Sequence, residues 1–285
     1  MIAFLSVFLP VAMMVLMLTL GLRLPPHEIA AEIRAPRALA LGLAAQLIGL
    51  PALALAIGRM LDLPVPIAAG LMLVAASPGG VSSNYAARLA GGRIGLSVTM
   101  TAVTSLIAPV TLPVVLGLAG VSLPEGTGLW RISVAMTGVA LVPMLAGMAL
   151  ARLAPRVAGW LAPRLDPLAK GLFLAIVVAT FVQNRAAIGE IASAAGLAVA
   201  ALALAGPVLG VTVARAGRLG RAQVRTIAIE CALQNVAIAI FVANALLQRP
   251  DLSAVGLLYA LAMNVVALVL IGAGGLRRPR AAQTE

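Results

Sequence analysis

The chain has 285 residues, of which 62% are apolar and 10% are charged, and its mean hydropathy is +1.10. An ordinary soluble domain has about 25% charged residues, so this composition excludes a soluble globular fold and a disordered chain. The net charge of +11 does not indicate nucleic-acid binding, because the 20 basic residues are spread between apolar blocks and aromatic residues make up only 3%.

Nine hydrophobic segments follow one another along the chain, each long enough to cross a bilayer as a helix. The first lacks the basic start and the small-residue cleavage site of a signal peptide, so we expect it to be a span. The single cysteine, Cys231, excludes an intrachain disulfide. The sequence predicts an all-α polytopic membrane protein with one integral membrane domain. The segments lie near residues 1–22, 36–60, 64–91, 93–120, 129–152, 163–186, 189–215, 222–247 and 252–275.

Basic residues indicate how these segments are oriented. If loops alternate between the two sides and the N-terminus lies outside, 16 of the 20 basic residues fall on the cytoplasmic side. Cytoplasmic loops of membrane proteins carry an excess of lysine and arginine. We therefore expect the inner membrane of a bacterium, with the N-terminus outside and residues 276–285 as a cytoplasmic tail.

Two segments contain residues that do not suit a continuous helix. The third includes the run Ser77–Asn84, with Pro78 followed by two glycines, and the eighth includes the polar run Glu230–Asn235. Proline removes a backbone donor and glycine relaxes the helix. Non-helical backbone at membrane depth persists only where it is buried in protein or lines a cavity.

The order of the interrupted segments suggests an internal symmetry. They are five segments apart, and an odd offset reverses direction across the membrane. Residues 1–120 and 163–275 are therefore expected to form two inverted repeat halves, joined by a connecting helix at 129–152. Interrupted helices at corresponding positions of inverted repeats point to the binding site of a transporter.

One carboxylate, Glu230, is expected inside the membrane, where it needs a cation partner. Transition metals would favour histidine or cysteine ligands, and Ca²⁺ or Mg²⁺ more carboxylates, so Na⁺ fits best, with H⁺ as the rival. We expect no intramembrane lysine or arginine, so an organic substrate would be held by helix N-termini and by Asn84, Asn235 and Asn264. The neutral polar residues that could reach Glu230 are Gln46, Ser83, Asn84, Ser97, Thr101, Gln234 and Asn264.

These motifs resemble the two crossover signatures of the bile acid:sodium symporter family, and the similarity extends over nearly the whole chain. The resemblance implies a core domain of segments 2, 3, 4, 7, 8 and 9 and a panel domain of segments 1, 5 and 6. It also implies two sodium sites that share Glu230. The first would comprise Ser83, Asn84, Ser97, Thr101 and Glu230. The second would comprise Gln46, Glu230 and Gln234 with the backbone carbonyls of Cys231 and Leu233.

The function that we expect is sodium-coupled symport, by alternating access, of an organic anion, either bile-acid-like or a smaller carboxylate. Val81 stands where the family often has threonine, which argues against bile acids themselves. The expected partners are Na⁺, the small organic anion and the lipid bilayer, with no nucleic acid, no obligate protein partner and no cofactor other than the coupling ions.

Two other classes remain as alternatives. A proton-coupled exchanger or efflux carrier of the arsenite-efflux type would depend on Cys231 as a reactive thiol. An intramembrane enzyme is less favoured, because the sequence contains no H-E-x-x-H motif and its one histidine lies in a loop. Structural roles also compete with ion binding: Ser83 and Asn84 could cap a half-helix, and Ser97 and Thr101 could pack between helices.

Overall fold

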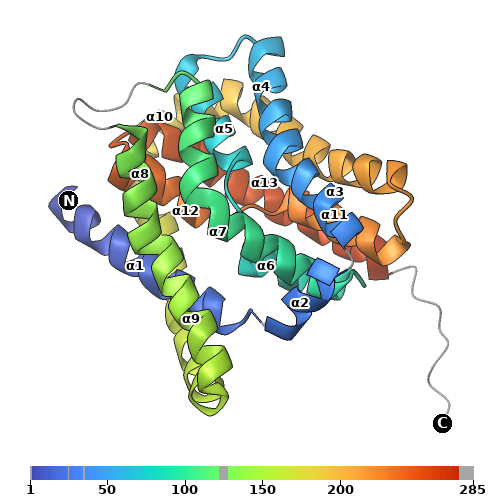
Figure 1. Ribbon diagram of the computed structural model, residues 1–285. Helices are drawn as coiled ribbons and strands as arrows, with labels where there is room; N and C mark the ends of the chain where they lie inside the picture. The colour runs from blue at the N-terminus through green and yellow to red at the C-terminus, as the bar shows by residue number, and fades with distance from the viewer. Residues whose placement is uncertain (1, 25, 35, 122–127, 276–285) are drawn as a thin grey trace.

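A computed structural model describes the chain except for residues 1, 25, 35, 122–127 and 276–285, and its described part is helical, without strands (Figure 1). Six helical stretches within it are long and apolar enough to cross a membrane. Three shorter apolar helices accompany them, at Val7–Leu22, Val65–Ala75 and Val236–Leu246. The expected all-helical membrane class is confirmed, whereas the count of nine spans stays a prediction. The six stretches are Pro36–Met60, Ile94–Leu118, Trp130–Leu153, Pro155–Val182, Ala195–Ala216 and Pro250–Ala273.

The helices of the first half are separated by short connections. The element that crosses at 36–60 contains a π-helical turn, η1, at Ala45–Gly49, which includes Gln46. Single π-turns within α-helices are frequent at functional sites. The elements of this half are α1 (Ile2–Leu22), α2 (Pro26–Arg34), α3 (Pro36–Ala44), η1, α4 (Leu50–Met60), α5 (Val65–Ala75), α6 (Val81–Leu89) and α7 (Ile94–Leu118).

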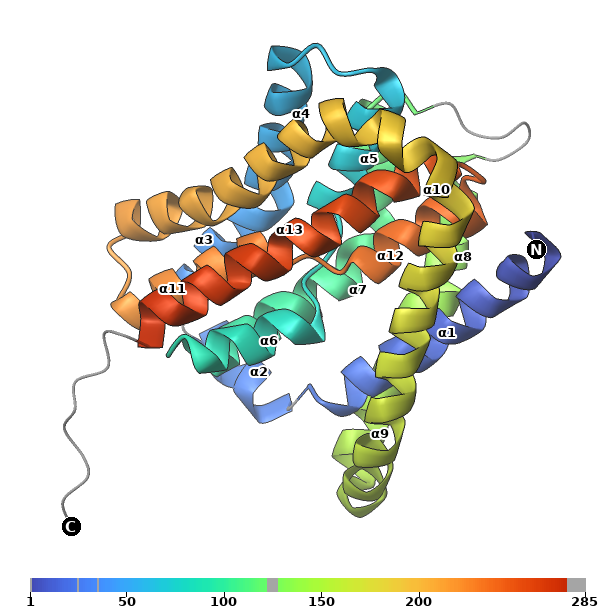
Figure 2. The same ribbon diagram turned by 180° about the vertical axis from the view of Figure 1, so that it is seen from behind.

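The second half contains the longest helix, α10 (Pro155–Ala216). Figure 2 shows α10 as two arms that meet at an angle, with α13 beside one of them. The elements are α8 (Leu129–Met136), η2 (Thr137–Leu141), α9 (Val142–Leu153), α10 (Pro155–Ala216), α11 (Arg221–Ala232), α12 (Val236–Phe241), η3 (Val242–Leu246) and α13 (Pro250–Gly275).

Both predicted interruptions are present. The third segment breaks between Ala75 and Val81, where α5 ends and α6 begins. The eighth breaks at residues 233–235, between α11 and α12. The second break contains neither proline nor glycine, so its origin lies in the tertiary contacts described below.

Three predicted connections are largely helical instead. Residues 153–162 and 187–188 were expected to flank a separate span, but α10 continues without a gap from Pro155 to Ala216. The stretch between the first two segments forms the short helix α2, which packs on α7. There Glu32 is buried and pairs with Arg93 at 2.5 Å. A charged loop in sequence is thus a docked helix in the fold.

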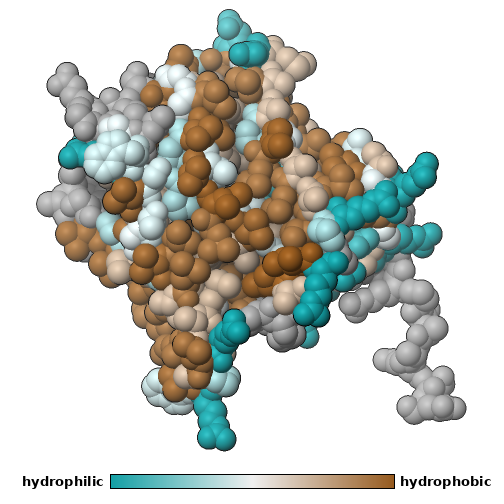
Figure 3. Space-filling model, viewed as in Figure 1, coloured by the Kyte–Doolittle hydropathy of each residue, from teal (hydrophilic) through white to brown (hydrophobic). Residues whose placement is uncertain are grey.

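The outer surface is suited to a lipid environment. Along α7, Val110, Val114 and Leu118 repeat every four residues and are 65%, 54% and 76% exposed. Exposing such an apolar stripe costs free energy in water but not in the hydrocarbon core of a bilayer. Figure 3 shows a broad hydrophobic face over α7, α8 and α9, with hydrophilic side chains gathered near α2 and α3. This distribution agrees with a protein embedded in a bilayer.

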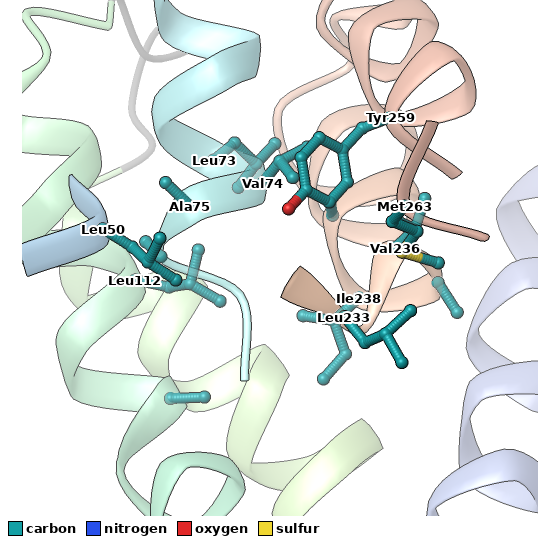
Figure 4. Packing of buried hydrophobic residues seen from close by; sticks show 14 of the residues in the cluster. Leu50, Leu73, Val74, Ala75, Leu112, Leu233, Val236, Ile238, Tyr259 and Met263 are labelled. Atoms are coloured by element: carbon teal, nitrogen blue, oxygen red, sulfur yellow. The ribbon is translucent and has the colours of Figure 1, made fainter. Parts of the chain in front are cut away.

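The core lies between the two interrupted elements. Figure 4 shows Tyr259 of α13 in this cluster with Leu73 and Val74 of α5 and Val236 of α12. Tyr259 is fully buried, and its hydroxyl donates to the carbonyl of Ala232 at 3.0 Å. Since Ala232 is the last residue of α11, this bond satisfies a carbonyl that the break would otherwise leave without a helical partner.

Candidate cation and substrate site

The two interruptions meet, and their backbones pair with each other. The amide of Asn235 donates to the carbonyl of Pro78 at 2.8 Å, and Gly79 and Gln234 form an isolated antiparallel bridge. The amide of Gly79 also donates to Oγ1 of Thr104 at 3.3 Å. Backbone groups released by each break are thus satisfied by the other break or by α7, as burial at membrane depth requires.

Glu230 lies directly beside this crossing, on α11, and is fully buried. The hydroxyl of Ser97 donates to its Oε1, and the hydroxyl of Thr101 donates to its Oε2 at 3.3 Å. Ser97 and Thr101 are one turn apart on α7, so they present both hydroxyls to the same carboxylate. Asn84 of α6 joins the group, with its Oδ1 2.8 Å from Oγ of Ser97.

This cluster contains more oxygen atoms that can accept a hydrogen bond than hydroxyl protons that can be donated to them. Each hydroxyl has one proton, yet Ser97 faces Asn84 Oδ1 as well as Glu230 Oε1. Thr101 likewise faces Asn84 Oδ1 at 3.4 Å as well as Glu230 Oε2. Ser83 contributes a further oxygen 3.5 Å from Thr101, while its own proton goes to the carbonyl of Gly80. A small, hard cation matches such a set of oxygens.

A second group of polar atoms surrounds Gln234. Its Nε2 donates to the carbonyl of Glu230 at 3.1 Å and to that of Cys231 at 3.3 Å, while its Oε1 accepts from Gln46 at 3.4 Å. Oε1 of Gln46 is buried without a hydrogen-bond partner among the described residues. An orphaned buried oxygen next to free carbonyl lone pairs is a second place suited to a cation. Leu233 lies at the break itself, in extended conformation.

A cavity of about 300 Å³ opens next to the crossing, between α1, α10 and α13. Its polar lining includes Asn235 and Asn264, two of the residues expected to hold substrate, together with the crossing residue Gly80. Asn84 is not among the lining residues and lies with the Glu230 cluster instead. Ser82 and Tyr85, one turn apart on α6, also line the cavity, although sequence analysis did not select them.

The wall of this cavity contains a basic residue, whereas the sequence led us to expect no intramembrane lysine or arginine near the substrate. Lys170 and Asp166 of α10 both line it and approach each other at 3.5 Å. At the same place Arg23 pairs with Asp166 at 2.7 Å and donates to the hydroxyl of Tyr85 at 2.8 Å. The expected span at 163–186 contains both Asp166 and Lys170, and the long helix α10 brings Lys170 to the cavity wall.

The fold and its two breaks define a helical membrane protein in which two interrupted helices cross beside a cluster of oxygens. A family model described as "Sodium Bile acid symporter family" matches residues 10–191, which is more than half of the chain. The chain belongs to this family. Ser83, Asn84, Ser97 and Thr101 lie inside the matched range, and Glu230 follows it.

Individual relatives agree with this assignment. The chain is 28% identical over 82% of its length to "Probable sodium/metabolite cotransporter BASS1, chloroplastic" of Arabidopsis thaliana, covering 58% of that protein. It is 31% identical over 80% of its length to "Probable sodium/metabolite cotransporter BASS2, chloroplastic" of Oryza sativa subsp. japonica, covering 54%. It is 33% identical over 50% of its length to "Uncharacterized sodium-dependent transporter YocS" of Bacillus subtilis, covering 44%. The chain therefore spans roughly half the length of the curated relatives that it matches.

Proposed function

We propose that the protein is a sodium-coupled secondary transporter that carries a small organic anion across a membrane. The observation that carries this proposal is the buried carboxylate of Glu230, surrounded by the oxygens of Ser97, Thr101 and Asn84 where the two interrupted helices cross. The names of the relatives, which include sodium-dependent transporters, support sodium as the coupling ion.

In this proposal Na⁺ binds in two places around Glu230. The first ion is held by Ser83, Asn84, Ser97, Thr101 and Glu230, where oxygens exceed protons. The second is held by Gln46, Glu230 and Gln234 with the carbonyls of Cys231 and Leu233, where the orphaned Oε1 of Gln46 gains a partner. Each ion neutralises part of the buried negative charge and so stabilises the crossed backbone.

The substrate occupies the cavity beside the crossing. Its volume of about 300 Å³ is at the lower end of the roughly 300–1,000 Å³ typical of ligand pockets, which favours a small carboxylate over a bile acid. Asn235 and Asn264 supply amide donors, and the ammonium of Lys170 supplies positive charge for the anion. Because Asn235 follows Gln234 directly, ions that order the crossing also order a substrate ligand, so the two affinities are coupled reciprocally.

Transport then follows by alternating access, with one part of the fold moving against the other around the crossing. We propose nine spans, two inverted halves at 1–120 and 163–275, and a connecting helix at 129–152. The N-terminus lies outside and the tail at 276–285 lies in the cytoplasm, in agreement with the positive-inside rule.

The decisive experiment compares melting temperatures in NaCl and in KCl at equal ionic strength. A ligand that binds only the folded state raises its stability, so NaCl should raise the Tm of the wild type by about 3 °C or more. Glu230→Gln should abolish this difference. The matched control is Asp62→Asn, which changes an exposed carboxylate and should keep the sodium response. Equal Tm values in the two salts would contradict sodium coupling.

The substrate site has a separate test. In proteoliposomes with a sodium gradient, Lys170→Met should raise the KM for uptake of a small carboxylate about tenfold or more, since it removes a charge-assisted contact. Its sodium-dependent Tm shift should stay that of the wild type, because Lys170 lies outside both proposed ion sites.

Cys231→Ala distinguishes sodium-coupled transport from the thiol-dependent alternative. Transport activity should persist in this variant, since Cys231 is fully buried and does not line the cavity.

A further inference from the structure

A second cavity lies within the fold, away from the crossing. Its volume is about 810 Å³, and it opens to the surface between α10, α11 and α13 near the turn that joins α10 to α11, with Ala90 also in its wall. None of its lining residues is shared with the cavity described above. It is therefore a separate feature, which the proposed transport function does not use.

Three arginines and an apolar wall define the character of this cavity. Arg215 comes from the last turn of α10, and Arg221 and Arg225 come from the first turns of α11. None of the residues that line it is acidic. Across the described part of the chain, no ion pair joins any of the three to a carboxylate. The N-terminus of α11 adds its partial positive charge to theirs.

The apolar part of the lining continues directly from the basic part. Val211 lies one turn before Arg215 on α10, a distance of about 6 Å along the helix, and Leu270 comes from the last turns of α13. Leu270 is part-exposed, as is Val211. The cavity is thus amphipathic, with guanidinium groups near the turn between α10 and α11 and aliphatic side chains beside them.

We propose that this cavity binds an anionic phospholipid, with its phosphate among Arg215, Arg221 and Arg225 and an acyl chain along Val211 and Leu270. Guanidinium groups bind phosphate oxygens through paired hydrogen bonds. Basic pockets between membrane helices at the cytoplasmic surface are sites for anionic lipid headgroups. A free phosphate would use the arginines alone and would leave the apolar wall without an occupant.

The lipid would contact α11, which carries Glu230 of the candidate cation site, together with α10 and α13. Ala228 and Ile229 line the cavity and directly precede Glu230. Arg225 donates to the carbonyl of Ala90 at 3.3 Å, which connects the cavity to the turn after α6. Binding there should therefore stabilise the folded protein as a whole.

The test measures the Tm of the purified full-length protein in a neutral detergent with added lipid. Phosphatidylglycerol should raise the Tm by about 3 °C or more above the value in phosphatidylcholine, and inorganic phosphate at the same concentration should not. The triple variant R215Q/R221Q/R225Q should lose this response. The matched control R34Q/R37Q/R218Q removes three arginines that are exposed and do not line the cavity, and it should keep the response.

Several results would overturn the proposal. Equal shifts with phosphatidylglycerol and phosphatidylcholine would exclude a headgroup site, and an equal shift with inorganic phosphate would make it a simple anion site. Loss of the response in both triple variants would indicate diffuse surface charge. A photo-crosslinking phosphatidylglycerol applied to the wild type gives a second readout that does not depend on the folding of the cavity variant. Adducts should concentrate at residues 211–229 and 270–273, and an even distribution over the membrane helices would contradict the site.

Discussion

Gly79 lies against the carboxylate of Glu230, so closely that a β-carbon at Gly79 would be 2.6 Å from Oε2. The same β-carbon would be 2.9 Å from Oγ1 of Thr101. Both distances are shorter than a normal contact, so any side chain at this position would enter the space between the carboxylate and the hydroxyl. The crossing needs glycine at position 79 because glycine has no side-chain volume. Backbone conformation is not the reason, since the φ of Gly79 is not positive.

Gly79→Ala is therefore expected to remove the sodium-dependent rise in Tm while leaving a folded protein. The added methyl group occupies space that the first proposed ion needs. Gly80→Ala is the neighbouring control for this readout, since the nearest atom to its β-carbon would be Oγ of Ser82 at 3.6 Å, an ordinary contact distance. A sodium response that survives in Gly79→Ala would argue against an ion between Glu230 and Thr101.

The hydroxyl of Ser97 should matter much more than that of Ser105, eight residues later on the same helix. Ser97→Ala removes the donor to Glu230 and a ligand of the proposed ion, so the sodium-dependent Tm shift should fall by at least half. Oγ of Ser105 is buried without a hydrogen-bond partner among the described residues. Ser105→Ala should therefore leave the Tm equal or higher and keep the sodium response. Equal effects of the two substitutions would contradict the assigned role of Ser97.

The ion pair between Glu32 and Arg93 should fix α2 against α7. Glu32 is only 3% exposed, whereas Arg93 is 44% exposed. Arg93→Gln leaves a buried carboxylate without its partner and should lower the free energy of unfolding by about 1–3 kcal/mol. The double variant Glu32→Gln with Arg93→Gln should recover part of this loss, which a double-mutant cycle in chemical denaturation would measure. Additive effects would show that the pair contributes no coupling energy.

Gly147 should be needed for the contact between α1 and α9. A β-carbon there would collide with the carbonyl of Leu18 and lie 2.8 Å from the amide of Leu22, and neither backbone atom can move aside freely. Gly147→Ala should therefore lower the Tm by several degrees. Gly138→Ala is the control, because nothing lies within 4 Å of its β-carbon and alanine favours the helix. A normal Tm for Gly147→Ala would mean that α1 and α9 separate easily.

The sequence predicted the elements whose signals are local. Pro78 and the two glycines after it predicted an interruption, and α5 ends and α6 begins around them. The spacing of Ser97 and Thr101 predicted a shared face, and both hydroxyls reach Glu230. The assignment of these residues to a sodium site stays a prediction, because helix geometry shows which side chains lie together but not which ion they bind.

Other features depend on tertiary contacts that no local pattern encodes. The charges around Glu32 resemble those of an exposed loop, but the helix α2 carries this residue into a buried pair with Arg93. Lys170 and Asp166 lie within the expected span at 163–186, but only the packing of α10 directs both to the cavity. In each case a partner far away in sequence determines which side of a helix is buried.

The crossing also has a consequence for the order in which the chain is built. Ser97 and Glu230 are 133 residues apart, so at ordinary rates of synthesis α7 is made on the order of ten seconds before α11 is complete. Throughout this interval the hydroxyls and amide of α6 and α7 lack the carboxylate that they surround in the finished protein. The crossing is therefore a late step of assembly, and its closure requires that α6, α7 and α11 have all entered the bilayer.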